Sequence, residues 1–293
     1  GRHNRGTQYA FSLAQMHNMG APIYCYTDKV NMQRYFPALY AHGMENFNFI
    51  NFNLDEHPLH TEIQKVKDGN KKLYRESSAW SSRCVEIMWG KFDWILHTIE
   101  QIGESEDKYL YWVDAGLAHG GILPVKYNSI YKPDDPTTNA SKKYNDSFMY
   151  DQIFNSGFPD YLAEYTGKNK LLHMVCRNPQ HDDPSHLPPN KDVKGTAVGG
   201  LFGGNTKMLK VWAEEAIEVC KDLLEHGYVI KEEDINSYLI NKHYSEDIVT
   251  YYMFDTWYHE DWLKDISRGV AFHPETQQPF CNFFEDYVKS QSL

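Results

Sequence analysis

The chain has 293 residues, of which 41% are hydrophobic, and a formal net charge of −11 at pH 7. This length and composition suit one large α/β domain, or a domain that carries a sizeable insertion. The acidic balance argues against a nucleic-acid surface, since such surfaces need clustered lysine and arginine to displace counterions. It leaves phosphate ligands open, because a phosphate pocket needs only a few local donors.

Cysteine usage and hydropathy narrow the class of protein further. The five cysteines are scattered and form no CxxC pair, which predicts reduced, buried thiols rather than a metal cluster. No run of about eighteen apolar residues exists, so we expect no membrane span, and no signal peptide is recognisable. We therefore expect a cytoplasmic protein; the sequons at Asn139 and Asn145 would matter only in a secreted one.

Apolar spacing in the first part of the chain predicts alternating helices and strands. The repeat of Val85, Phe92 and Ile99 at helical spacing, for example, predicts a long helix with one core face. The expected elements are helices at residues 6–20, 31–42 and 81–102, strands at 22–28, 46–54 and 108–114, and a short helix with a loop within 55–80.

The second part of the chain continues the alternation after a long polar segment at 126–150 that we interpret as a loop or lid. Strands that alternate with helices predict a largely parallel sheet with helices on both faces. The expected elements are helices at 149–156, 206–226 and 231–243, strands at 170–177 and 247–254, a loop at 179–189, and a strand with a glycine-rich turn at 195–204.

Two acidic residues end predicted strands. The apolar run from Tyr109 ends on Asp114, and the strand at 22–28 ends on Asp28. A carboxylate at the end of a buried strand is costly unless it is used outside the apolar layer, and ligands of open α/β sheets bind beyond the carboxyl ends of strands. Both acids are therefore candidates to bind a ribose, a sugar hydroxyl or a divalent ion. The alternative is that they cap the following turn or helix.

Basic and glycine-rich segments supply further candidates. Lys91 and Arg2 have side chains that can neutralise a phosphate, although a solvated surface role is the alternative for each. The segment Gly199-Gly-Leu-Phe-Gly-Gly-Asn205 allows a close approach of backbone to ligand, or else forms a bulge or tight turn. Its spacing matches neither a P-loop nor a GxGxxG fingerprint.

Acidic and histidine residues near the carboxyl end are candidates for acid–base chemistry. Glu232-Glu-Asp234 begins a predicted helix, where acids are also favoured by the helix dipole alone. His181 and His186 lie in a loop without helical metal-ligand spacing, so a solvated loop is favoured there. His259 and His273 are further candidates.

The order of these segments, over nearly the whole chain, resembles the nucleotide-sugar glycosyltransferases of the GT-A fold. Within that group the chain looks most like the HtrL/YibB (WlaTC) family, a bacterial glycan-locus family. The segments that carry the resemblance are Gly1-Arg2, Tyr26-Thr-Asp-Lys29, Lys91-Phe92, Tyr111-Trp-Val-Asp-Ala-Gly116, Gly199-Gly-Leu-Phe-Gly-Gly204 and Glu232-Glu-Asp234.

The resemblance implies one GT-A-like domain over residues 1–293, with a mostly parallel sheet flanked by helices. Residues 1–125 would form the nucleotide-sugar-binding half, and residues 126–293 the lid and acceptor half. The implied donor-binding residues are Arg2, Asp28, Lys91, Asp114 and Gly116, and the implied cleft residues are Gly199, Gly200, Gly203, Gly204 and Asn205. The implied partners are a nucleotide-sugar donor and a glycan acceptor.

Metal dependence is left open by one departure from the GT-A pattern. Many of these enzymes carry Asp-X-Asp after this strand and hold Mn²⁺ or Mg²⁺ with the last Asp, where this chain has Gly116. If such a metal binds, we expect Asp114 as a ligand, with His273 or His119 supplying the missing one. A metal-free enzyme would need arginine or lysine to offset the leaving diphosphate.

Three functions follow as hypotheses. The first is a glycosyltransferase, in which Glu233 or Asp234 acts as the base that an inverting reaction needs near the acceptor hydroxyl. The second is a non-catalytic nucleotide- or glycan-binding protein of the same fold. The third is a metal-dependent hydrolase that uses the histidine and aspartate loops. The fold alone does not decide among them, since function depends on the site.

Overall fold

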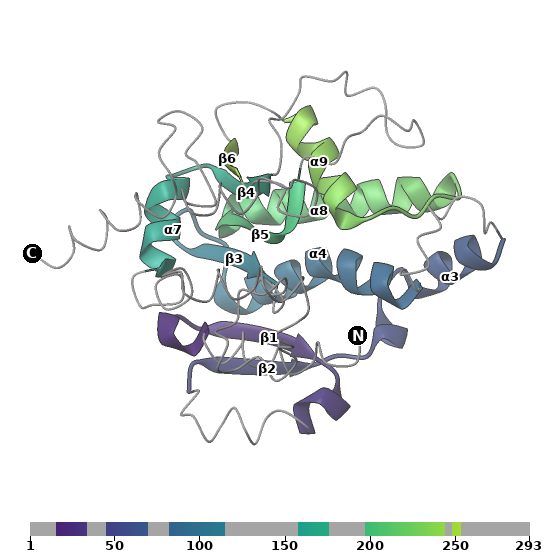
Figure 1. Ribbon diagram of the computed structural model, residues 1–293, viewed down its shortest axis with the longest axis horizontal. Coiled ribbons are helices and arrows are strands. Elements are labelled where there is room, and N and C mark those ends of the chain that lie inside the picture. Colours follow the sequence, from purple (N-terminus) through teal and green to yellow (C-terminus); the bar gives the residue numbers. More distant parts are fainter. Residues whose placement is uncertain are drawn as a thin grey trace, which may run out of the picture. The chain divides into compact units, whose positions relative to one another are not determined.

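The computed structural model describes residues 16–33, 45–69, 82–114, 158–175, 197–243 and 248–252, which form a mixed α/β protein (Figure 1). The chain divides into two compact units. The first unit includes the strands β1 (Ile23–Thr27) and β2 (Phe47–Asn51), Val113 and Asp114, and most of helix α7 (Phe158–Thr166). The first unit also includes the other described residues before Phe52, and the remaining described residues belong to the second unit. The expected division near residue 125 stays a prediction.

The described part of the first unit centres on the parallel pair β1–β2, in which Ile23 lies opposite Phe47. A short 3-10 helix, η2 (His17–Met19), precedes β1 and ends at Gly20, whose φ of 67° favours glycine. The amide of Asn46 donates to the carbonyl oxygen of Ala21 at 2.8 Å and thereby ties the entry of β2 to the entry of β1. Local side-chain bonds thus set where both strands begin.

A four-stranded sheet organises the second unit, in the order β3 (Tyr109–Val113), β5 (Ala197–Asn205), β4 (Leu171–Val175) and β6 (Ile248–Tyr252). Strand β4 is parallel to β6 and antiparallel to β5. Strand β5 also runs opposite to β3, because Thr206 bonds to Lys108 while Gly203 lies against Tyr111. The carboxyl ends of β3, β4 and β6 therefore share one edge with the start of β5. The expected parallel pairing is right for β4–β6 and, in the first unit, for β1–β2, and it is wrong for β5, which is antiparallel to both of its neighbours.

Glycines in β5 allow close contact with its neighbours. A Cβ on Gly203 would collide with the backbone of Leu110 and Tyr111 in β3, and one on Gly204 would lie 2.6 Å from the carbonyl oxygen of Lys170 beside β4. The pairing with β4 also slips, so that residues 198–201 of β5 lie opposite Met174 alone. The sequence predicted a turn within this segment, but the structure has an irregular strand, which agrees with the bulge that was the alternative.

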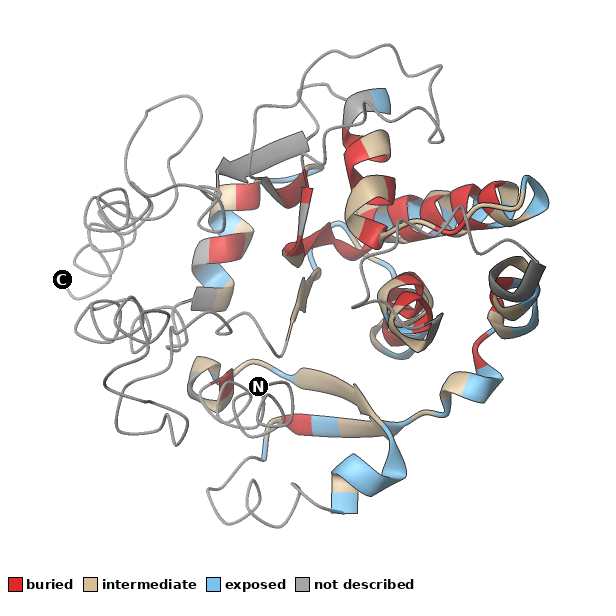
Figure 2. Ribbon diagram, turned by 45° about the vertical axis from the view of Figure 1, so that its right-hand side comes forward, coloured by how far each residue is buried: buried red, intermediate tan, exposed pale blue. Residues whose placement is uncertain are grey.

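Helices cover this sheet and form the core of the second unit. Helices α4 (Ser82–Ile102) and α8 (Thr206–Glu225) lie side by side, and α9 (Glu232–Lys242) contacts β5 and α8. Buried positions recur along α4 and α8 with exposed positions between them (Figure 2), as expected for amphipathic helices. The largest fully buried side chains include Trp89, Phe92, Phe202, Leu209 and Ile235.

The predicted helices at 81–102, 206–226 and 231–243 are confirmed within a residue or two. So are the strands at 22–28, 108–114, 170–177 and 247–254. The predicted strand at 46–54 ends early, because Asn53 caps the 3-10 helix η3 (Leu54–Glu56), which leads to α3 (His60–Gly69). The expected loops at 126–150 and 179–189 and the helix at 149–156 lie outside the described residues. Within the described parts of the chain, no helix is long and apolar enough to cross a membrane.

Candidate functional site

A buried lysine joins three elements of the second unit. Lys91 lies in the middle of α4 with only 4% of its surface exposed. Its Nζ donates to Glu232 Oε1 at 2.5 Å and to the carbonyl oxygen of Gly199 at 3.0 Å. The same ammonium lies 5.4 Å from the centre of the Trp112 ring, within the range of a cation–π interaction. Because an isolated buried ammonium is strongly unfavourable, these partners are what allow Lys91 to remain charged there.

The residues around Lys91 come from distant parts of the sequence. Gly199 lies 108 positions and Glu232 lies 141 positions away along the chain. Gly199 has no room for a side chain, since a Cβ there would collide with the carboxylate of Glu232. This cluster, Lys91, Trp112, Gly199 and Glu232, lies where β3 ends and β5 begins. Ligands of α/β sheets bind at such edges, and bulges like the one in β5 are frequent beside active sites.

The first turn of α9 is anchored firmly beside this cluster. Trp89 donates its indole N–H to the carbonyl oxygen of Ile230 at 2.9 Å, just before the helix. Ser237 Oγ accepts from the backbone N–H of Ala197 at 2.8 Å and donates to the carbonyl oxygen of Glu233 at 2.6 Å. The start of α9 is thus tied to α4 on one side and to the start of β5 on the other.

Two expected catalytic acids, Glu233 and Asp234, lie in this anchored turn. The Glu233 side chain is 35% exposed, with Oε2 3.7 Å from Lys231 Nζ. Burial raises the pKa of Glu233, and the neighbouring charge of Glu232 raises it further, against the opposing effects of Lys231 and Lys91. A reachable carboxyl with a raised pKa is suited to general acid–base chemistry near neutral pH. Acids at the start of a helix are also favoured by the helix dipole. An acid at this position can therefore stabilise the helix and also take part in acid–base chemistry.

The two strand-end acids differ in their surroundings. Asp28 is exposed, and its oxygens accept from the backbone N–H of Asn31 at 2.8 Å and from the Asn31 amide at 2.6 Å. Asp28 therefore caps the helical residues 29–33, as the alternative interpretation had it. Asp114 is half-buried and directly follows β3. Both acids belong to the first unit.

The other expected site residues divide into two groups. Asn205 caps α8 by accepting from the backbone N–H of Met208 at 2.9 Å, and Gly200, Gly203 and Gly204 lie in β5. The residues Arg2, Gly116, His119, His181, His186, His259 and His273 lie outside the described residues. Among the residues that the structure does describe, no group of three or more histidine, cysteine or acidic side chains is arranged to hold a metal ion.

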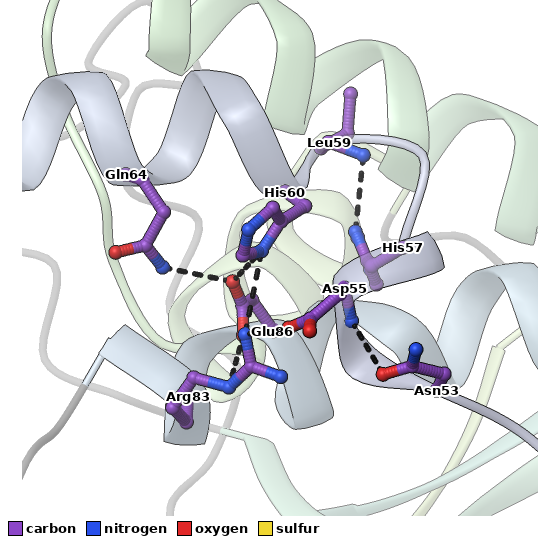
Figure 3. A network of polar contacts seen from close by, with 8 residues as sticks. All are labelled: Asn53, Asp55, His57, Leu59, His60, Gln64, Arg83 and Glu86. Carbon is purple, nitrogen blue, oxygen red and sulfur yellow. Dashed lines mark hydrogen bonds and ion pairs between the residues drawn. The ribbon is translucent and has the colours of Figure 1, made fainter.

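A second polar cluster, which the sequence analysis missed, joins α3 to α4 (Figure 3). Glu86 is fully buried, and its Oε1 lies 2.5 Å from His60 Nδ1 and accepts from the Gln64 amide at 2.9 Å. Arg83 Nε lies 3.2 Å from Glu86 Oε2, while its Nη1 lies 2.8 Å from Asp55. A buried carboxylate is stable only with such partners.

His57 and Asp93 form a second contact between the same segments. His57 Nδ1 accepts from the backbone N–H of Leu59 at 3.0 Å, which leaves the proton of the neutral ring on Nε2, 3.4 Å from Asp93 Oδ2. Burial lowers the pKa of His57 and raises that of Asp93 to about 6, with Lys221 opposing the latter shift. Asp93 lies two turns after Glu86 on α4. The spacing of these two acids was the only sign of these polar contacts in the sequence. We assign both contacts to docking of the η3–α3 segment.

Comparisons with protein-family models, with curated proteins and with solved structures find no match to this chain.

Proposed function

We propose that the protein is a glycosyltransferase that moves a sugar from a nucleotide-diphospho-sugar donor to a hydroxyl group of a glycan or another acceptor. The observation that supports this proposal best is the meeting of Lys91, Trp112, Gly199 and Glu232 in one cluster. These residues belong to four of the segments on which the resemblance to GT-A enzymes depends. Their contact near the end of β3 supports the proposal, because ligands of α/β sheets bind at such edges.

In this proposal Glu233 is the acid–base residue. Its carboxyl is half-buried and has a raised pKa, so it retains a proton to higher pH than an ordinary glutamate and accepts one more readily near neutrality. A base of this kind takes the proton from the acceptor hydroxyl as the hydroxyl oxygen attacks the anomeric carbon of the sugar, and the bond from that carbon to the diphosphate breaks so that the nucleoside diphosphate leaves. Asp234, in the same turn, is the second choice for this role.

Asp114 is the proposed donor-binding residue, because a half-buried carboxylate that directly follows β3 can accept hydrogen bonds from ribose or sugar hydroxyls. Lys91, which was expected to bind donor phosphates, makes its recorded contacts with Glu232 and Gly199. We therefore propose a supporting role for Lys91. Arg2 remains the proposed phosphate ligand.

The resemblance also implies Mn²⁺ or Mg²⁺, which would offset the charge of the leaving diphosphate. Divalent ions of this kind need several oxygen ligands, and the described residues hold no group of three or more histidine, cysteine or acidic side chains arranged for one. These residues alone do not fit a divalent ion, so no step of the proposed reaction is derived through one.

The first test is a thermal-shift screen of the protein with UDP, GDP, CMP and their sugars, with and without Mn²⁺. A ligand that binds only the folded chain raises the melting temperature. We expect a shift with one nucleotide that is lost in Asp114→Ala. The matched control is Asp107→Asn, at the other end of β3, where the side chain is 81% exposed and pairs with Lys168. If no nucleotide shifted the melting temperature, with or without Mn²⁺, the result would contradict the proposal.

A further inference from the structure

We propose that the Lys91–Glu232 ion pair is a positioning device for Glu233, which holds the first turn of α9 against β5 and places a fixed negative charge beside the acid–base residue. This inference rests on the proposed function, since it takes Glu233 as the residue that exchanges the proton. Glu232 itself is a positioning residue, because its carboxylate is bound to Lys91 and only 2% of its surface is exposed.

The geometry explains how the pair controls the turn. Lys91 Nζ bridges the carbonyl oxygen of Gly199 and the carboxylate of Glu232, so one ammonium sets the spacing between β5 and α9. Gly199 completes the arrangement, because any side chain there would displace the Glu232 carboxylate. Ser237 and Trp89 hold the surrounding backbone. The Glu233 side chain therefore projects from a helical turn that is held by contacts with both α4 and β5.

The charges that face Glu233 also depend on the pair. Glu232 and Asp234 from the same turn favour its protonated form, whereas Lys231 and Lys91 favour the carboxylate. After burial, Glu232 has the largest effect of these four groups. Since Lys91 keeps Glu232 in place, the pair determines how strongly this charge acts on Glu233.

Stability alone does not explain why a charged pair occupies this position. A buried ion pair is often no more stabilising than apolar side chains of similar volume, because both ions lose their hydration. Glu232 Oε2 is buried and makes no hydrogen bond with the described residues, which adds to that penalty. The bonds of Trp89 and Ser237 hold the backbone around this turn, whereas the ion pair fixes the Glu232 side chain within it. A charge retained under these conditions indicates a role in the electrostatics of the site.

The experiment measures the pKa of Glu233 directly by carbon-13 NMR of side-chain carboxyls, with Glu233→Gln to assign the signal. We compare the wild type with Glu232→Gln and with the double variant Lys91→Met/Glu232→Gln, which leaves no unpaired buried charge and so protects the fold. The pKa of Glu233 should fall in both variants, and less in the double variant because the opposing charge of Lys91 is also lost. The matched control is Glu106→Gln, whose carboxylate is about half exposed and pairs with Lys207.

Enzyme kinetics provide the second readout. With a donor that turns over, we expect kcat to fall about tenfold to a hundredfold in the double variant, as for a misplaced catalytic group, with KM little changed. The acidic limb of the pH profile of kcat should move to lower pH. A Glu233 pKa that is the same in the folded double variant and the wild type would overturn the inference even if donor turnover is observed. The NMR measurement needs no substrate, so a normal pKa response without turnover of any donor would instead overturn the proposed function.

Discussion

Lys91 Nζ lies 2.5 Å from Glu232 Oε1, in a part of the second unit where both side chains are almost fully buried. The pair connects the middle of α4 to the first residue of α9, and the carbonyl oxygen of Gly199 takes a further hydrogen bond from the same ammonium. Since neither charge has water to solvate it, each one depends on the other.

Removal of one partner should therefore be far more harmful than removal of both. Lys91→Met leaves Glu232 buried without its counter-ion, and we expect the free energy of unfolding to fall by about 3–5 kcal/mol. Lys91→Met/Glu232→Gln should recover most of this loss. Urea unfolding followed by circular dichroism measures both changes. Lys207→Met, which breaks an exposed pair with Glu106, should have little effect. Equal losses in the single and double variants would contradict the account.

Two glycines of β5 should respond differently to the same substitution. A Cβ on Gly203 meets the backbone of β3, which has no freedom to move, so Gly203→Ala should destabilise the fold by about 2–3 kcal/mol. A Cβ on Gly199 meets the end of the Glu232 side chain, which can swing away. Gly199→Ala should therefore leave the contact of β5 with β3 intact, but it should weaken the Lys91–Glu232 pair and shift the pKa of Glu233. Thermal unfolding and carboxyl NMR separate the two effects, and a Gly199→Ala variant with the wild-type Glu233 pKa would count against this view.

Asp93 should make the protein less stable at neutral pH. Burial raises its pKa from 3.8 to about 6, so the folded chain binds more protons than the unfolded chain between these values. Stability falls as the pH rises through this window, and the full penalty is present above pH 6. With a quarter of the side chain exposed, we expect Asp93→Asn to add about 1–2 kcal/mol near pH 7.5 and nothing near pH 3.5. Urea unfolding at both pH values tests this, and a gain of equal size at both would refute it.

His173 should make the fold sensitive to acid. Its ring lies between Phe202, at 5.6 Å, and Trp212, at 4.5 Å, and burial lowers its pKa from 6.5 to about 3. The unfolded chain thus binds more protons between these values, and stability falls as the pH falls through the window. His173→Phe should reduce this loss of stability. Each unit by which the pKa of His173 is lowered corresponds to a loss of about 1.4 kcal/mol. Unfolding curves from about pH 7 to pH 4 test it, with the exposed His226→Phe as control; an unchanged slope in His173→Phe would contradict the assignment.

Local patterns predicted much of the second unit. The spacing of Val85, Phe92 and Ile99 identified α4 because burial on a helix recurs every three or four residues. Gly227 marked the end of α8, because glycine readily adopts the left-handed conformation that often ends a helix, and its φ is 78°. The direction of β5 was not predictable in this way. Strand direction depends on the connection that precedes the strand, and the glycines that make β5 irregular also fit a turn.

The contacts of the candidate site were harder to infer than its residues. Lys91 and the acids of α9 were recognised as candidates, yet nothing local in the sequence shows that Lys91 binds Glu232 across 141 positions. Asp28 and Asp114 looked alike as strand-end acids, and only the bonds from Asn31 identify Asp28 as a cap. Glu86 was missed because its partners His60 and Gln64 belong to α3 and meet it only in the folded chain.

The most direct test of the central claim is donor turnover by the wild type and by Glu233→Gln. Each nucleotide-diphospho-sugar is incubated with the protein and a mixture of glycan acceptors, and the release of nucleotide is followed together with the transfer of labelled sugar. The proposed function predicts transfer from one donor by the wild type and a loss of about a hundredfold or more in Glu233→Gln, whose folding is checked by circular dichroism. No transfer from any donor, or equal transfer by both proteins, would contradict it.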